Sequence, residues 1–235
     1  MPELDMVLGD LVAANRILYR QGVVDGFGHV SARHPDRPDR FLLARSMAPG
    51  QVTRTDILEF HLDGTPVDPE GPKPYLERFI HGEIYRARAD VMAVVHSHSP
   101  SVVPFGVVPS VPLRPICHMS GFIGEAAPVF EIREAAGPAS DMLIRTPGLG
   151  AALADKLGPA SVVLMRGHGS TVVGGTIRQA VFRAVYTEVN ARLQAEALRL
   201  GPPVFLTGEE AAAASATNDG QIDRAWNLWR AEAEA

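Results

Sequence analysis

A short apolar stretch that ends in two histidines, Val91-Met92-Ala93-Val94-Val95-His96-Ser97-His98, gives the strongest indication of the fold. Its near-continuous run of apolar residues is typical of a strand that is buried in the centre of a sheet. Alternate residues of a strand point the same way, so His96 and His98 project from one face with Cα atoms about 6.5 Å apart. Two imidazoles at this spacing can converge on one metal ion, although the pair alone is a weak signal.

The sequence on either side of this stretch predicts a mixture of helices and strands. On the N-terminal side we expect a helix over residues 3–20, a hairpin formed by 28–33 and 41–44, a second hairpin formed by 57–62 and 65–67 around Asp63-Gly64, and a helix over 75–88. On the C-terminal side we expect a short helix over 149–157 and a buried strand over 161–165. Thr176 and Gln179 predict a capping box at the start of a long helix that ends at Gly201, and a final helix is expected around Trp226 and Trp229.

A third histidine, His168, follows the second buried strand and lies between Gly167 and Gly169, which permit close approach of the backbone. Three neutral imidazoles with an open fourth position are typical of a catalytic metal site. A cupin would need a Glu soon after His98, and a facial triad would need a carboxylate in place of His98, but Ser99-Pro100-Ser101 follows. Neither scheme fits this sequence.

The nearest candidate carboxylate is Glu77, on the helix that leads into the strand with the two histidines. Helical spacing places it on the same face as His81. An acid beside a divalent cation in a partly dry cleft is suited to proton transfer. The alternative interpretation is a solvated carboxylate that pairs with Arg78 or Lys73.

Length and composition set the broad class of the protein. The chain has 235 residues, of which 46% are hydrophobic, and a formal net charge of -5, as expected for a globular protein with one domain over residues 1–235. Basic residues are scattered, which argues against nucleic acid as a partner. The lack of a long apolar run and the acidic N-terminus predict a cytoplasmic protein without a membrane partner. Cys117 is the only cysteine, so His and carboxylates must hold any metal.

The order of these residues resembles that of the class II aldolase/adducin family, in which a Glu on a helix precedes His-x-His after an apolar strand and a distant Gly-His-Gly. The likeness extends from the first helix to the long C-terminal helix. It implies an α/β fold, an α/β/α sandwich on a central, mainly antiparallel sheet, and a homotetramer with active sites between subunits. It also implies that His96, His98 and His168 bind a divalent metal, Zn²⁺ or Mn²⁺, and that Glu77 is the catalytic acid/base.

Three segments depart from the phosphate-binding elements of the sugar-phosphate aldolases in this family. They read Gly28-His29-Val30-Ser31, Ala44-Arg45-Ser46-Met47 and Tyr75-Leu76. His29, Arg45 and Ser46 could instead hold a carboxylate or phenolate, and Tyr75 adds a planar surface, although Arg45 could equally form a surface ion pair.

Two further residues have open interpretations. His118 lies where aldolases of the family carry an acid/base Tyr from a neighbouring subunit, so it is a candidate catalytic residue or else a solvated loop residue. Tyr186 either lines the substrate pocket or packs in the core.

Within the family, the segments Gly22–Ser31, Arg78–Gly82 and Pro115–His118 look like those of the aromatic decarboxylase branch. This resemblance implies a metal-dependent carbon–carbon lyase of aromatic compound degradation that decarboxylates a small hydroxylated aromatic or pyridine carboxylate or dicarboxylate. The alternative is a class II aldolase or epimerase that acts on a non-phosphorylated hydroxy-carbonyl compound. A third possibility is an adducin-like binding module, which would not need all three histidines and Glu77.

Overall fold

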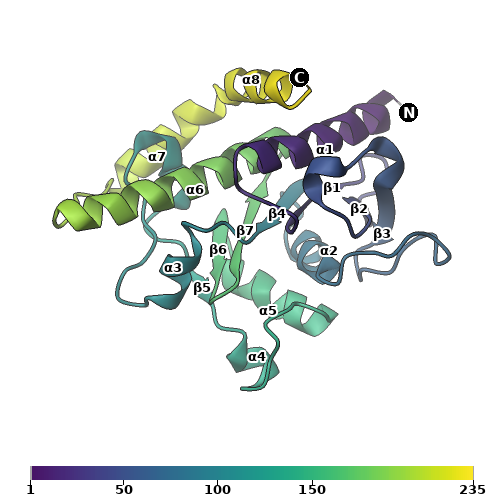
Figure 1. The fold of residues 1–235 in the computed structure, drawn as a ribbon, viewed down its shortest axis with the longest axis horizontal. Coiled ribbons are helices and arrows are strands. Elements are labelled where there is room, and N and C mark those ends of the chain that lie inside the picture. Colours follow the sequence, from purple (N-terminus) through teal and green to yellow (C-terminus); the bar gives the residue numbers. More distant parts are fainter. Residues whose placement is uncertain (1, 235) are drawn as a thin grey trace.

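The computed structural model describes residues 2–234 and contains a seven-stranded sheet with helices on both faces (Figure 1). The strand order is β3-β2-β1-β4-β7-β6-β5. Only the pairing of β5 with β6 is parallel among the pairings of the described residues, and the other five are antiparallel. The predicted α/β sandwich with a mainly antiparallel sheet is therefore confirmed.

The strands are short and most are fully buried. Their bounds are β1 (His29–Arg33), β2 (Arg40–Ala44), β3 (Ile57–His61), β4 (Ala93–Ser97), β5 (Val129–Phe130), β6 (Val162–Met165) and β7 (Gly169–Gly174). The α-helices are α1 (Pro2–Arg20), α2 (Arg78–Ala87), α3 (Val103–Val107), α4 (Arg133–Ala136), α5 (Pro147–Leu157), α6 (Ile177–Leu200), α7 (Gly208–Asp219) and α8 (Ile222–Glu234), and the 3₁₀ turns are η1 (Pro49–Gln51), η2 (Arg54–Asp56) and η3 (His118–Ile123).

Alternating strand residues form two separate apolar cores, one on each face of the sheet. Ala93 and Val95 of β4 pack in the core beneath α1, α6 and α8, whereas Val94 packs in the core beneath α2 and α5. Figure 1 shows α1 and α6 on one side of the sheet and α2 and α5 on the other. Because strand residues alternate, His96 continues the row of Val94 and points toward the α2 side.

Several predicted elements differ in detail from the structure. The strand β7 was not predicted, because glycines bound a short run of Ser, Thr and Val, yet it is central and pairs with β4 and β6. The second hairpin has a strand only in its first arm, since the return segment makes an isolated bridge at Pro66. The C-terminal tail forms two helices, α7 and α8, rather than one.

The long helix α6 begins at its predicted cap. The hydroxyl of Thr176 accepts a hydrogen bond from the backbone N–H of Gln179 at 3.0 Å. The Gln179 side chain accepts from Gly175 rather than from the capping residue, so the predicted reciprocal capping box is only half formed. Within residues 2–234, no helix is both long and apolar enough to cross a membrane.

Candidate metal centre and active-site cleft

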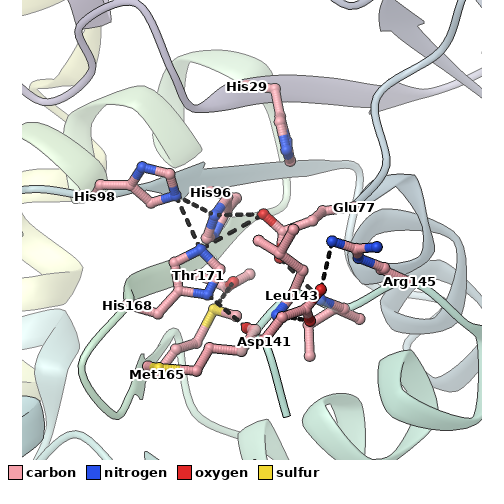
Figure 2. A network of polar contacts seen from close by, with 12 residues as sticks. His29, Glu77, His96, His98, Asp141, Leu143, Arg145, Met165, His168 and Thr171 are labelled. Atoms are coloured by element: carbon pink, nitrogen blue, oxygen red, sulfur yellow. Dashed lines mark hydrogen bonds and ion pairs between the residues drawn. The ribbon is translucent and has the colours of Figure 1, made fainter.

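Four side chains from three segments of the chain converge at one end of the sheet (Figure 2). The ring nitrogens Nε2 of His96 and His98 lie 3.2 Å apart, and those of His98 and His168 lie 2.9 Å apart. The carboxylate oxygen Oε2 of Glu77 lies 3.5 Å from Nε2 of both His96 and His168. The structure thus brings together the three histidines that the sequence suggested as metal ligands and Glu77, which it suggested as the acid/base.

The sheet positions the three histidines. His96 belongs to β4 and His98 follows its last residue, so both project to the same side as the strand leaves the sheet. His168 lies in the tight turn between β6 and β7, where its backbone N–H donates to the carbonyl of Met165 at 3.0 Å. A Cβ on Gly169 would lie 2.0 Å from the carbonyl oxygen of Ser97, so only glycine lets this turn approach β4.

Backbone carbonyls fix the orientation of two of these imidazoles. The Nδ1 of His96 lies 3.1 Å from the carbonyl oxygen of Ser170, and the Nδ1 of His168 lies 3.0 Å from that of Met142. A carbonyl can only accept, so each Nδ1 carries a proton, and in the neutral imidazole that binds a metal Nε2 keeps its lone pair. Lone pairs at the close separations given above repel one another unless a cation lies between them, and a ring of imidazole nitrogens with a carboxylate is a donor set that Zn²⁺ and Mn²⁺ accept.

Glu77 differs from its predicted place on the helix, because it is the residue that precedes α2. The residue is 7% exposed, and its Oε1 accepts a hydrogen bond from the backbone N–H of Ile144 at 2.9 Å while Oε2 faces the histidines. Burial acts to raise the pKa of Glu77, but the imidazoles of His96 and His168 outweigh burial and hold it well below its ordinary value. This result contradicts the alternative of a solvated carboxylate that pairs with Arg78 or Lys73.

The segment around Met142 and Ile144 holds two members of this cluster in place. The carbonyl of Met142 holds His168, and two residues later the amide of Ile144 holds Glu77. Met142 has a φ of 71°, which a residue with a side chain rarely adopts and which costs about 1–3 kcal/mol. An ion pair between Asp141 and Arg145 spans the same segment (Figure 2).

Three members of the cluster, Glu77, His96 and His98, line a cleft with a volume of about 520 Å³. Of the residues predicted to bind substrate, His29, Ser46 and Tyr75 line this cleft together with Glu77, His96 and His98. The ring of Tyr75 lies 4.6 Å from that of His29, centroid to centroid. Phe27, Met47, Leu76 and Leu143 give the cleft apolar walls.

A hollow of similar size, about 560 Å³, lies beside α1 and the first residues of α6 and α8. It is lined by none of the predicted site residues that the structure describes. Two of its carboxylates, Asp10 and Asp223, form ion pairs with Arg178. The chemistry of the molecule therefore points to the cleft with the histidines.

Three predicted site residues belong neither to the cleft nor to the histidine cluster of this chain, as far as residues 2–234 define them. The Nε of Arg45 lies 2.6 Å from Oδ1 of Asp56, the ion pair that the sequence left open as an alternative. His118 is exposed at the first turn of η3. Tyr186 packs against Phe182 and Trp229, with ring centroids 4.6 and 6.2 Å away.

A buried chain of polar side chains leads from the cleft into the α2 side of the molecule. The Nδ1 of His29 lies 2.6 Å from Nε2 of His81, and the Nδ1 of His81 lies 2.6 Å from the hydroxyl of Ser31. The Ser31 hydroxyl also lies 2.7 Å from that of Tyr85. Burial is the largest cause that lowers the pKa of His29 well below its ordinary value, and burial lowers that of His81 to about 3, so both imidazoles are neutral.

Sequence reasoning did not find several groups that build the cleft. Ser31 and Tyr85 were not singled out, although their two-residue and four-residue spacing from His29 and His81 would have placed them on the same strand and helix faces. The backbone carbonyls of Met142 and Ser170 and the apolar wall residue Leu143 had no sequence signal, because a loop conformation positions them.

Comparisons with known proteins agree with this geometry. Residues 9–195 match the family described as Class II Aldolase and Adducin N-terminal domain. The chain is 39% identical to decarboxylase tropJ of Talaromyces stipitatus over 95% of this chain and 92% of that protein. It is 31% identical to 3,4-dihydroxyphthalate decarboxylase of Terrabacter sp. over 85% of each chain. An aldolase II superfamily protein from Pseudomonas syringae has a similar fold, with a TM-score of 0.81, 24% identity, and coverage of 100% of this chain and 94% of that one.

Proposed function

Because the chain belongs to the class II aldolase and adducin family, we propose that it is a metal-dependent decarboxylase of hydroxylated aromatic or pyridine carboxylates. The family and the decarboxylase relatives support a lyase. The observation that carries the finer proposal is the cleft itself, in which three imidazoles and a buried carboxylate meet a wall formed by His29 and Tyr75. That wall suits a planar substrate with oxygen substituents.

His96, His98 and His168 would hold the ion, Zn²⁺ or Mn²⁺. When bound, a divalent ion supplies a Lewis acid that stabilises negative charge on the oxygens of a chelating hydroxy acid. The backbone carbonyls of Ser170 and Met142 keep two of the three imidazoles in the required tautomer. The apolar walls at Phe27 and Leu143 exclude water from the ring of the substrate.

Glu77 would move the proton that the reaction requires. Loss of CO₂ breaks a carbon–carbon bond and leaves its electron pair on the ring, and the ring carbon must then take up a proton. As a carboxylate, Glu77 accepts the proton of a substrate hydroxyl through Oε2 and returns it to the ring carbon. The hydrogen bond from Ile144 to Oε1 keeps Oε2 directed at the reacting groups.

Some of the residues that the sequence suggested for the site lie outside the cleft. His118 and Tyr186 lie away from the cleft of their own chain, so they could act only at a site of a neighbouring copy, as in a homotetramer with active sites between subunits. Arg45 would reach a second substrate carboxylate only by leaving Asp56. The one-domain organisation over residues 1–235 and the cytoplasmic location stay predictions.

The second candidate is an aldolase or epimerase that acts on a non-phosphorylated hydroxy-carbonyl compound. The fold similarity to aldolase II proteins favours it, and the same four residues would serve it. Release of an aldehyde instead of CO₂ distinguishes the two activities.

The test is CO₂ release from hydroxybenzoates, hydroxyphthalates and pyridine dicarboxylates by protein reconstituted with Zn²⁺ or Mn²⁺. We expect turnover that a chelator abolishes and that the metal restores. Glu77→Gln should keep the metal and lose about 100-fold to 10,000-fold in rate. Metal-loaded protein that releases no CO₂ from any of these compounds would contradict the decarboxylase and favour cleavage of an aldol.

A further inference from the structure

We propose that the buried chain Tyr85–Ser31–His81 fixes the tautomer of His29, so that His29 presents an N–H group to the cleft and donates a hydrogen bond to an anionic oxygen of the substrate. The chain consists of three consecutive hydrogen bonds of 2.6, 2.6 and 2.7 Å. Its members are almost completely removed from water, with exposures of 4% for His29, 0% for His81 and Ser31, and 1% for Tyr85. Tyr85, Ser31 and His81 must therefore find side-chain hydrogen-bond partners among these four residues.

The direction of the chain follows from counting hydrogens, beginning at Tyr85. Within residues 2–234, the side-chain hydrogen-bond partner of the Tyr85 hydroxyl is the hydroxyl of Ser31, and its backbone contact is the N–H of Val94, which can only donate to it. Burial raises the pKa of Tyr85 well above its ordinary value, so the phenol keeps its proton. A buried O–H that donates to nothing costs about 1–3 kcal/mol, whereas an unused second lone pair on oxygen costs less. Tyr85 therefore donates to Ser31.

The direction of each following hydrogen bond is then determined, because each neutral hydroxyl or imidazole has a single hydrogen to donate. Ser31 accepts from Tyr85 and donates its own hydrogen to Nδ1 of His81. A neutral His81 with an accepting Nδ1 carries its hydrogen on Nε2, and it donates this hydrogen to Nδ1 of His29. A neutral His29 with an accepting Nδ1 must carry its own hydrogen on Nε2, which is the ring nitrogen left for the cleft.

The reverse direction has a clear energetic cost. If His29 donated to His81, then His81 would donate to Ser31 and Ser31 to Tyr85, and the Tyr85 hydrogen would be left in the core without an acceptor. The guanidinium of Arg33 lies 4.9 Å from the centroid of the Tyr85 ring and holds the Tyr85 backbone carbonyl through a hydrogen bond of 2.7 Å. Arg33 is itself a pure donor, so it offers no alternative acceptor.

This tautomer gives His29 a different task from the neighbouring histidines. His96 and His168 carry their hydrogens on Nδ1 and direct lone pairs at the metal position, whereas His29 directs a hydrogen at the cleft. An N–H group cannot ligate a cation or act as a base, but it can bind a carboxylate or phenolate oxygen. The tautomer stands on the hydrogen-bond chain alone, and only the role of a substrate oxygen as acceptor rests on the proposed function.

The tautomer can be measured directly in the Zn²⁺-loaded protein by ¹⁵N NMR with labelled histidine, since protonated and unprotonated ring nitrogens resonate far apart. We expect His29 to be protonated on Nε2 only, and His96 and His168 on Nδ1 only. The ring-nitrogen signals that are missing from the spectrum of His29→Gln are those of His29, so this variant provides their assignment. A His29 protonated on Nδ1, doubly protonated, or averaged between tautomers would overturn the proposal, whether or not the protein is a decarboxylase.

The donor role can be tested by calorimetric binding of salicylate, a simple hydroxy acid, to Zn²⁺-loaded variants. A Gln side chain can place an amide N–H near the position of Nε2, whereas Leu cannot donate. We expect His29→Leu to weaken binding about 10-fold to 100-fold and His29→Gln to recover most of this loss. Equal losses in both variants, or no loss in His29→Leu, would overturn the donor role. If the wild-type protein did not bind salicylate, this result would contradict the proposed function and with it the donor role of His29. The tautomer of His29 would still be decided by the NMR result.

Discussion

The two groups of histidines that meet at the cleft are held in opposite ways. On one side, His96 and His168 are anchored through Nδ1 by backbone carbonyls at 3.1 and 3.0 Å. On the other side, His29 and His81 are anchored by side chains, through a chain that ends at Tyr85. We refer to the first group, with His98 and Glu77, as the metal side, and to the second group, with Ser46 and Tyr75, as the substrate side.

The difference shows how one residue type can serve two chemical purposes in one cleft. A backbone carbonyl accepts and never donates, so a neutral imidazole held by it presents a lone pair to the cleft. A side-chain hydroxyl or imidazole can do either, so the outcome on the substrate side depends on the last member of the chain. The metal side is thus fixed by the fold, whereas the substrate side can be altered by substitution of a few side chains.

The largest effect is expected from removal of a metal-side imidazole. His96→Ala should lose the bound metal and about 1000-fold or more of the activity, because several kcal/mol of charge stabilisation depend on the ion. Metal content by mass spectrometry and the initial rate of CO₂ release measure the two losses. Circular dichroism should show an unchanged fold, and a variant that kept its turnover would contradict the assignment of this side.

A smaller effect is expected from a change that moves the metal side without touching a ligand. A Cβ on Gly169 would lie 2.0 Å from the Ser97 carbonyl oxygen and 3.0 Å from Cα of His98, whereas one on Gly175 would meet only Gln179 at 3.5 Å and Asp90 at 3.9 Å. Gly169→Ala should therefore cost about 1–3 kcal/mol of stability and weaken metal affinity, while Gly175→Ala should do neither.

Thermal melts with and without Zn²⁺ separate the two consequences of Gly169→Ala. The shift in Tm that Zn²⁺ produces should be reduced in Gly169→Ala and unchanged in Gly175→Ala. Equal shifts in both variants would show that the metal side does not depend on the close approach of β7 to β4.

The smallest effect concerns the edge of the substrate side, where Asp56 holds Arg45. Hydrogen bonds from Thr53 and then from Arg45 lower the pKa of Asp56 from 3.8 to about 2. A depressed carboxyl pKa stabilises the folded protein fully above the unfolded value of 3.8, and this contribution is lost as the pH falls through about 2. Asp56→Asn should lower Tm by a few degrees at pH 7 and by less near pH 2. A Tm difference that stayed constant over this range would contradict the linkage.

The metal side was largely predictable from sequence, because it follows from local patterns. Apolar runs that end in histidines identified β4 and β6, and strand alternation placed His96 and His98 on one face. The exact position of Glu77 was not predictable, since the helical periodicity of residues 75–88 does not reveal that the helix begins only at Arg78.

The substrate side was less predictable, because long-range packing determines it. His29, Ser46 and Tyr75 come from three segments that the fold brings together, and no spacing rule relates Arg45 to the cleft or to Asp56. The strand β7 was missed because two glycines frame it, although its register with β4 and β6 is what carries His168 to the other ligands.

The pairing of β4 with β7 also has a consequence for the biosynthesis of the protein. These neighbouring strands are separated in the chain by α3, η3, β5, α4, α5 and β6, so they can join only after most of the polypeptide has left the ribosome. His96 and His98 therefore cannot bind an ion together with His168 until β7 has been synthesised and has paired with β4. The metal centre is therefore a late product of maturation, and a chain truncated before β7 would keep both early histidines and still be unable to assemble it.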